Sequence, residues 1–252
     1  MILKTNEEIA KIRRAGKILA QVAKALLPQV EVGVNLKELD QTAKKLIIEA
    51  GGRPAFLGYQ PYGAAKPYMY TLCTSLNDVV VHGTPKNYKL KSGDIVSIDM
   101  GVVYDGYYAD AAWTVGVGEI SEKAQKLIRV AEKALFDGIK AINIGKHLGD
   151  IGAAISGTVK QHGFSVVEGL TGHGVGKELH EDPTVFNEGE KGTGMVLKRG
   201  LVIAIEPMIS AGKPQIVQLK DDSYATADGS LSAHFEHTVA ITENGAEILT
   251  RI

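Results

Sequence analysis

An internal repeat constrains the fold of this chain more than any other sequence feature. The apolar pattern of residues 33–51 returns at 145–163, a shift of 112, with glycine at both ends of each segment. The strand-like segment 90–99 returns at 197–206, a shift of 107. Both of these segments begin Leu-Lys-x-Gly and end in an acidic residue, which two unrelated segments would rarely share. We infer an internal duplication.

The repeat predicts an α+β domain built from two related halves. Each half, roughly residues 1–118 and 119–252, has two helices followed by strands. Apolar periodicity and capping residues place the helices at about 5–28, 35–51, 121–139 and 147–162. We expect residues 1–252 to form a single catalytic domain, with a continuous sheet and its helices on one side.

The composition excludes several function classes. The net charge of −1 gives no basic excess for binding DNA. The single cysteine, Cys73, excludes an intrachain disulfide framework and a multi-cysteine metal site. No apolar run approaches the roughly 18 residues of a membrane span, and charges interrupt the N-terminal segment where a signal peptide would be apolar. We therefore expect a soluble cytoplasmic protein without a membrane partner.

Two carboxylates in the first half are predicted to share one face of a hairpin. Asp99 ends an apolar strand, and Asp105 and Gly106 supply a turn before Asp110. A loop of Asp105 and Gly106 makes Asp99 and Asp110 diagonal neighbours, whereas a loop one residue earlier makes them direct partners. In either register two close negative charges require a cation or a proton.

The second half supplies matching groups. Glu206 corresponds to Asp99 in the repeat, and Glu236 lies on a later strand as Asp110 does. His173, between two glycines, is the best nitrogen ligand, while the surrounding sequence fits neither a phosphate loop nor a His-Glu-x-x-His zinc helix. This oxygen-rich set suits a paired site for divalent Mn, Fe, Co or Zn.

The order and spacing of these five residues resemble the ligand set of the methionine aminopeptidases. The resemblance spans nearly the whole chain and includes the segments 77–83, 172–176, 206–207 and 236–238. It implies the pita-bread fold: a pseudo-twofold duplication with a curved, mainly antiparallel sheet and helices on its outer face. Prolidase and aminopeptidase P share that fold. The short N-terminus and the 33-residue gap from His173 to Glu206 resemble the short, bacterial-style type I enzymes.

The resemblance also implies residue roles. Asp99 would bind one metal ion, His173 and Glu206 the other, and Asp110 and Glu236 would bridge the two. His82 and His180 would contact the substrate, and Glu206 would accept a proton from the attacking water. We interpret the remaining histidines as ordinary structural residues: His147, His162, His234 and His237.

The pocket for the methionine side chain departs from the usual pattern. The matching positions are Phe56, Tyr59, Tyr62, Cys73, His82 and Leu179. The family often has cysteine at the position of Phe56, an aromatic residue at that of Leu179, and a tryptophan near Asp222. The stretch 58–73 is about six residues longer than in common bacterial relatives. Backbone positions that bind a monovalent cation in relatives match Asn77, Val79 and Ser232.

The function implied is removal of the initiator methionine from nascent chains whose second residue is small, by a monomeric enzyme with two divalent metal ions. Contact with the ribosome would fit this role. Two alternatives stay open. The chain could cleave X-Pro bonds, as prolidase-like members do, or it could be a non-catalytic peptide-binding module on the same fold.

Overall fold

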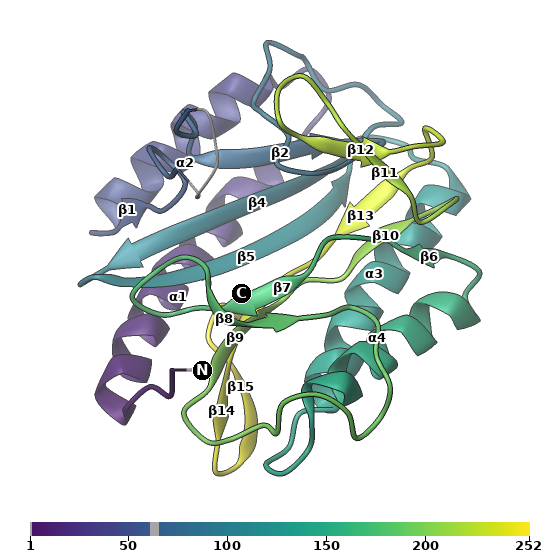
Figure 1. Cartoon of the computed structure of the whole chain (residues 1–252). Helices are drawn as coiled ribbons and strands as arrows, with labels where there is room; N and C mark the ends of the chain where they lie inside the picture. Colours follow the sequence, from purple (N-terminus) through teal and green to yellow (C-terminus); the bar gives the residue numbers. More distant parts are fainter. Residues whose placement is uncertain (1, 61–65) are drawn as a thin grey trace.

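The computed structural model describes residues 2–60 and 66–252, with four α-helices and fifteen strands among them (Figure 1). The helices are α1 (Asn6–Leu26), α2 (Leu36–Glu49), α3 (Glu122–Lys140) and α4 (Leu148–Gln161), and a short 3-10 helix, η1 (Leu27–Gln29), follows α1. All four helices lie within one or two residues of their predicted ends.

The helices begin where the capping residues predict. The Thr5 side chain accepts a hydrogen bond from Glu8 N, and the Glu8 carboxylate accepts one from Thr5 N. Ser121 caps α3 by accepting from Ala124 N at 3.2 Å. These bonds satisfy amide groups that have no partner within the helix.

Backbone hydrogen bonding confirms the duplicated helix-pair-plus-strand arrangement. An isolated bridge joins Asn35 to Lys89 at the start of α2, and a second joins His147 to Val196 at the start of α4. The shifts of 112 and 107 found in the sequence convert the first bridge into the second, since 35 + 112 = 147 and 89 + 107 = 196. Assignment of residues 1–252 to one catalytic domain, with a division near residue 118, stays a prediction.

The described strands pair in four ladders, and every pairing between named strands is antiparallel. The first ladder contains β1 (Arg53–Pro54), β2 (Leu72–Leu76), β4 (Ile95–Tyr104) and β5 (Tyr107–Gly116). The second contains β7 (Gly172–Gly174), β8 (Glu181–Val185), β9 (Val202–Ile205), β14 (His237–Thr242) and β15 (Gly245–Ile248). Two three-stranded ladders complete the set: β6 (Ser165–Val166), β10 (Met208–Ser210) and β13 (Ser232–His234), and β3 (Val79–Val81), β11 (Ile216–Gln218) and β12 (Tyr224–Thr226).

The sheet predicted as continuous is interrupted in the second half. The chain leaves β9 at Glu206 and enters β10 after Pro207, whose nitrogen cannot donate a ladder bond. Its partner strand breaks at the same level, between β13 and β14. Glu236 N still donates to Ala112 O at 2.9 Å, so this segment joins β5 of the first ladder.

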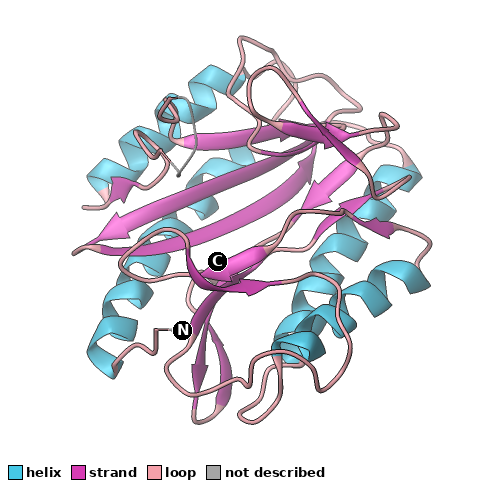
Figure 2. Ribbon diagram, viewed as in Figure 1, coloured by secondary structure: helices cyan, strands magenta, loops and turns pink. Residues whose placement is uncertain are grey.

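The helices cover one side of the strands and leave the other for the site. Strands β4 and β5 pass in front of α1 in Figure 2, and α1 packs against both. Leu19 of α1 and Ile98 of β4 are fully buried in the main apolar core. Burial of such side chains contributes about 1.5–3 kcal/mol each. Across residues 2–60 and 66–252, the helices are too short or too polar to span a membrane.

Candidate metal centre

The first carboxylate pair lies on the β4–β5 hairpin. Tyr104 pairs with Tyr107, so the two-residue loop is Asp105 and Gly106, the first of the two registers left open by the sequence. Asp99 pairs with Ala112 and Gly101 with Asp110, so the two aspartates are diagonal neighbours on one face. Both are buried, with 8% and 4% of their surface exposed.

The second pair lies where the second-half strands break. Ile205 pairs with His237 and Met208 with His234, and the residue numbers of both pairs add up to 442. Glu206 and Glu236 have the same sum, so the register continues across the break and sets them opposite each other. Residues directly opposite in an antiparallel pair share a face. The Glu236 side chain is buried, whereas 12% of the Glu206 side chain is exposed.

His173 sits on β7, beside the second pair. Its flanking glycines allow a close approach, since a Cβ atom on Gly172 would collide with Ala204 O and one on Gly174 with Asp182 O. His173 Nδ1 lies 2.9 Å from Gly174 O, to which it can donate, and Nε2 lies 3.5 Å from Glu206 Oε1. A backbone acceptor at one ring nitrogen directs the other, unprotonated nitrogen toward a metal.

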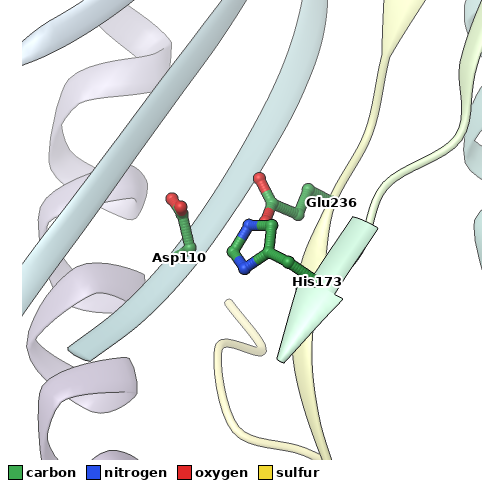
Figure 3. A group of neighbouring side chains, drawn as sticks. All are labelled: Asp110, His173 and Glu236. Atoms are coloured by element: carbon green, nitrogen blue, oxygen red, sulfur yellow. The ribbon is translucent and has the colours of Figure 1, made fainter. Parts of the chain in front are cut away.

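The structure brings four of the five predicted ligands into groups that could hold a metal ion. One ligand atom each from Asp110, His173 and Glu236 lies within 4.8 Å of the others, and Figure 3 shows these side chains converging from β5, β7 and the segment before β14. Glu206 and Glu236 form a second such group with His234. Asp99 enters neither group, but Asp110 is its immediate electrostatic neighbour.

The cluster fits divalent cations. Asp99 Oδ1, Asp110 Oδ1 and Glu236 Oε1 are buried without a hydrogen-bond partner, which costs free energy unless a cation or proton compensates. Burial, followed by repulsion from the neighbouring carboxylates, raises the pKa of all three groups well above the usual range. Burial also opposes ionisation of Glu206, but His234 and His173 outweigh it and lower its pKa.

His234 is the functional candidate that sequence reasoning missed. Only 1% of it is exposed, and Nε2 lies 3.3 Å from Glu206 Oε2 and 3.9 Å from Glu236 Oε2. Nε2 has no hydrogen-bond partner. The spacing of two from Glu236 along an extended segment was an available signal, since such residues share a face.

The other three histidines interpreted as structural do have protein neighbours. His237 Nδ1 lies 2.9 Å from Thr250 Oγ1, and His162 Nδ1 lies 2.8 Å from Thr158 O. His147 Nδ1 lies 3.8 Å from an Asp150 carboxylate oxygen at the start of α4. Among residues 2–60 and 66–252, none of the three belongs to a group of side chains that could hold a metal ion.

His180 and His82 border the cluster. The His180 ring lies 4.3 Å from the His173 ring, centre to centre, and its Nδ1 lies 2.6 Å from Tyr59 Oη. Burial, with a smaller effect of His173, lowers the pKa of His180 to about 4, so the ring is neutral at pH 7. His82 has a positive φ of 58° and packs edge-on against Tyr224, and burial lowers its pKa.

Three predicted pocket residues form a small apolar cluster next to His180. Phe56, Cys73 and Leu179 are buried there, and Tyr59 packs against them. Tyr68, from the longer stretch, was not predicted to join this wall; its hydroxyl donates to Leu72 O at 2.8 Å. Burial raises the pKa of the Cys73 thiol, which keeps it protonated. The remaining prediction, Tyr62, lies outside the described residues.

Two further features surround the cluster. An open cleft of about 760 Å³ reaches His173 and His180, with Lys177 and Glu178 also on its wall. At the predicted monovalent site, Ser232 N donates to Asn77 O at 2.8 Å. Ser232 and Asn77 therefore lie next to each other, and a cation bound there stays a prediction.

Known proteins resemble the chain over its whole length. The model of metallopeptidase family M24 matches residues 10–243. A methionine aminopeptidase of Clostridium perfringens is 47% identical, over 100% of this chain and 99% of that protein. The crystal structure of a methionine aminopeptidase from Thermotoga maritima superposes with a TM-score of 0.94 at 44% identity, over 100% of both chains.

A more distant structure shares the fold. The prolidase of Pyrococcus furiosus superposes with a TM-score of 0.80 at 27% identity, over 100% of this chain and 66% of the prolidase. The pita-bread fold and the resemblance inferred from the sequence are thus confirmed. The chain belongs to metallopeptidase family M24, and within that family to the methionine aminopeptidases.

Proposed function

We propose that this chain removes an N-terminal methionine from peptides whose second residue is small. The observation that carries the proposal is the convergence of Asp110, His173 and Glu236 beside His180, in a chain that matches methionine aminopeptidases from end to end. The cluster supplies the ligands of a paired metal site, and the adjacent apolar pocket supplies a place for a thioether side chain.

Two divalent ions would complete the site, and Co, Mn, Fe or Zn suit its ligands. Asp99 would hold one ion, His173 and Glu206 the other, and Asp110 and Glu236 would bridge them. Bound divalent ions lower the pKa of a water molecule and polarise a carbonyl oxygen. The buried, partnerless oxygens of Asp99, Asp110 and Glu236 support this assignment.

Glu206 would accept the proton of the attacking water. Its lowered pKa keeps it ionised at neutral pH. Its side chain also retains some contact with solvent.

His180 would donate a hydrogen bond to the carbonyl oxygen of the scissile bond. Burial raises the pKa of Tyr59, so its hydroxyl stays protonated and can donate to His180 Nδ1. The proton of the neutral His180 ring then resides on Nε2. Tyr59 is thus a positioning residue, while His82 would contact the substrate from the opposite rim.

The methionine side chain would occupy the apolar cluster of Phe56, Cys73 and Leu179. Tyr59 would link this pocket to His180, so that a side chain filling the pocket lies next to the carbonyl donor. Asn77, Val79 and Ser232 would hold one monovalent cation with backbone oxygens.

The cellular setting follows from this substrate. Nascent polypeptide N-termini at the ribosome are where such methionines occur, so we propose a monomeric cytoplasmic enzyme that acts on them. The chain's net charge of −1 gives it no electrostatic pull toward ribosomal RNA. No DNA or membrane partner is part of this proposal.

One experiment separates the candidate functions. The protein is loaded with a divalent metal, its metal content is counted, and release of the first residue from Met-Ala-Ser and from an Ala-Pro peptide is measured. We expect metal-dependent release of methionine from the first peptide. Preference for the Ala-Pro peptide would favour a prolidase-like enzyme, and hydrolysis of neither would favour a peptide-binding module.

A further inference from the structure

We propose that His234 is a second nitrogen ligand of the metal centre, bound together with Glu206 and Glu236. This inference rests on the proposed function, because it concerns the same dinuclear site. It adds an imidazole to the four carboxylates and one histidine that the family resemblance implies.

The first argument is the unpartnered nitrogen. His234 is almost completely buried, and a ring nitrogen in such a place normally has a hydrogen-bond partner. Nε2 has none, although Glu206 Oε2 is only 3.3 Å away. The two atoms are close enough for a hydrogen bond, so it is the angle at the ring nitrogen that is unfavourable. Nε2 is therefore close to the carboxylate oxygen but forms no well-aligned hydrogen bond with it.

The second argument is the spacing of the donor atoms. Nε2 is 3.3 Å from Glu206 Oε2 and 3.9 Å from Glu236 Oε2. Metal–nitrogen and metal–oxygen bonds are about 2.0–2.2 Å long, so two ligands of one ion lie about 3–4 Å apart at ordinary coordination angles. Both distances satisfy this condition, and one ligand atom from each of the three side chains lies within 4.8 Å of the others.

The third argument is the rigid backbone that holds the ring. His234 N donates to Thr114 Oγ1 at 2.8 Å, and Thr114 Oγ1 lies 2.8 Å from His234 O. His234 is also the last residue of β13 and pairs with Met208 of β10. The backbone of His234 is therefore fixed immediately beside the break where Glu206 and Glu236 face each other.

The test counts imidazole ligands in the protein loaded with Co²⁺. Proton NMR of the Co²⁺ protein shows one strongly shifted, solvent-exchangeable ring N–H signal for each bound histidine, and X-ray absorption at the cobalt edge gives an independent imidazole count. We expect His234→Gln to remove one signal and one imidazole that the wild-type protein shows. Titration calorimetry should show one Co²⁺ binding step weakened about tenfold or more.

The control is His162→Gln, which removes a histidine directly after α4 that contacts Thr158 O. It should leave the imidazole count and both binding steps unchanged. An equal imidazole count in wild type and His234→Gln would overturn the proposal, even if affinity fell, because His234 would then only contact Glu206. If His234→Gln failed to fold, the His173→Gln variant would decide: it must keep one shifted N–H signal, and loss of every such signal would also overturn the proposal.

The same samples separate this proposal from the proposed function. A protein that binds two Co²⁺ ions and releases methionine, but shows no ligand signal from His234, refutes only the additional ligand. A protein that binds no Co²⁺ refutes both.

Discussion

The two carboxylate pairs of the metal centre come from equivalent strands of a duplicated fold, yet the chain presents them differently. Asp99 and Asp110 are diagonal neighbours on an unbroken hairpin with a two-residue loop. Glu206 and Glu236 are register partners at a break, and the chain between them runs through four strands, β10 to β13.

This difference separates two structural tasks. A continuous hairpin fixes its two acids by regular geometry, and backbone bonds on both sides keep their separation constant. The break at Glu206 and Pro207 releases Glu206 from the ladder, so its side chain keeps contact with solvent and with two histidines. The first half thus supplies rigid ligands, and the second adds the group suited to proton transfer.

The largest expected effect comes from breaking the rigid pair. Asp110→Asn should abolish metal binding and lower methionine release by more than about 10⁴-fold, beyond the usual contribution of a general base alone. Metal content and peptide hydrolysis measure this. Asp105→Asn, at the turn of the same hairpin, is the control and should bind both ions. Two tightly bound ions in Asp110→Asn would refute its bridging role.

Changing Glu206 tests the second pair. Glu206→Gln keeps the size of the side chain but cannot accept a proton, so kcat should fall about 10²–10⁴-fold. KM for Met-Ala-Ser should change little. A comparison at saturating metal separates this loss from weakened metal binding; an unchanged kcat there would assign the proton transfer elsewhere.

The second half also carries six of the seven histidines, which makes it the acid-sensitive half. Burial lowers the pKa of His237 to about 4, against about 6.5 in an unfolded chain. Between these values the unfolded state binds more protons, so stability falls as the pH drops from about 6.5 toward 4.

This histidine should cost about 2 kcal/mol of unfolding free energy between pH 7 and pH 5. Denaturant titrations at both pH values measure the change. The fall in unfolding free energy from pH 7 to pH 5 should be about 2 kcal/mol smaller in His237→Gln than in the wild type. The difference between the two proteins removes the opposing contribution of the acidic cluster. Equal pH dependence in the two proteins would mean that His237 takes up a proton as readily in the folded state as in the unfolded chain.

Removing the Tyr59 hydroxyl tests a contact between the two halves of the chain, the one from Tyr59 in the first half to His180 in the second. Tyr59→Phe frees the His180 ring to adopt the other tautomer, and loss of such a supporting hydrogen bond costs about 10–100-fold. We expect kcat to fall about tenfold with the metal content unchanged. Phe keeps the apolar wall of the pocket, so a rise in KM with normal kcat would instead indicate a role in side-chain binding.

The smallest expected effect comes from alanine substitutions at Gly93 and Gly200, which occupy equivalent positions in the two halves. Gly93 and Gly200 have φ values of 99° and 90°, where any other residue is strained by about 1 kcal/mol. A Cβ atom at Gly93 would meet nothing within 4 Å, whereas one at Gly200 would lie 2.7 Å from Lys4 O. Gly200→Ala should therefore destabilise more than Gly93→Ala, as thermal unfolding would show. Equal losses of stability in the two variants would mean that the N-terminal segment around Lys4 moves aside without a loss of free energy.

Much of the site was predictable because it depends on short-range patterns. Capping residues set the helix ends, and the apolar segment before Glu206 indicated an acid at the end of β9. Asp99 was also predicted to end its strand, which was wrong: β4 continues to Tyr104, because the ladder with β5 extends to the hairpin loop. The two-residue loop at Asp105 and Gly106 was one of two registers that the sequence allowed, and tertiary hydrogen bonds chose between them. His234 was missed because a buried histidine ordinarily bonds to nearby protein groups, and only the fold shows that Nε2 does not.

By itself, the sequence determined the duplication, the four helices and the set of acidic and imidazole groups, since these follow from periodicity and from the identity of the residues. The tertiary structure alone decided that Glu206 and Glu236 face each other across a break, that Tyr59 reaches His180, and that Tyr68 joins the pocket. The physical reason is that these contacts join distant segments, whose approach depends on how both halves pack around one core.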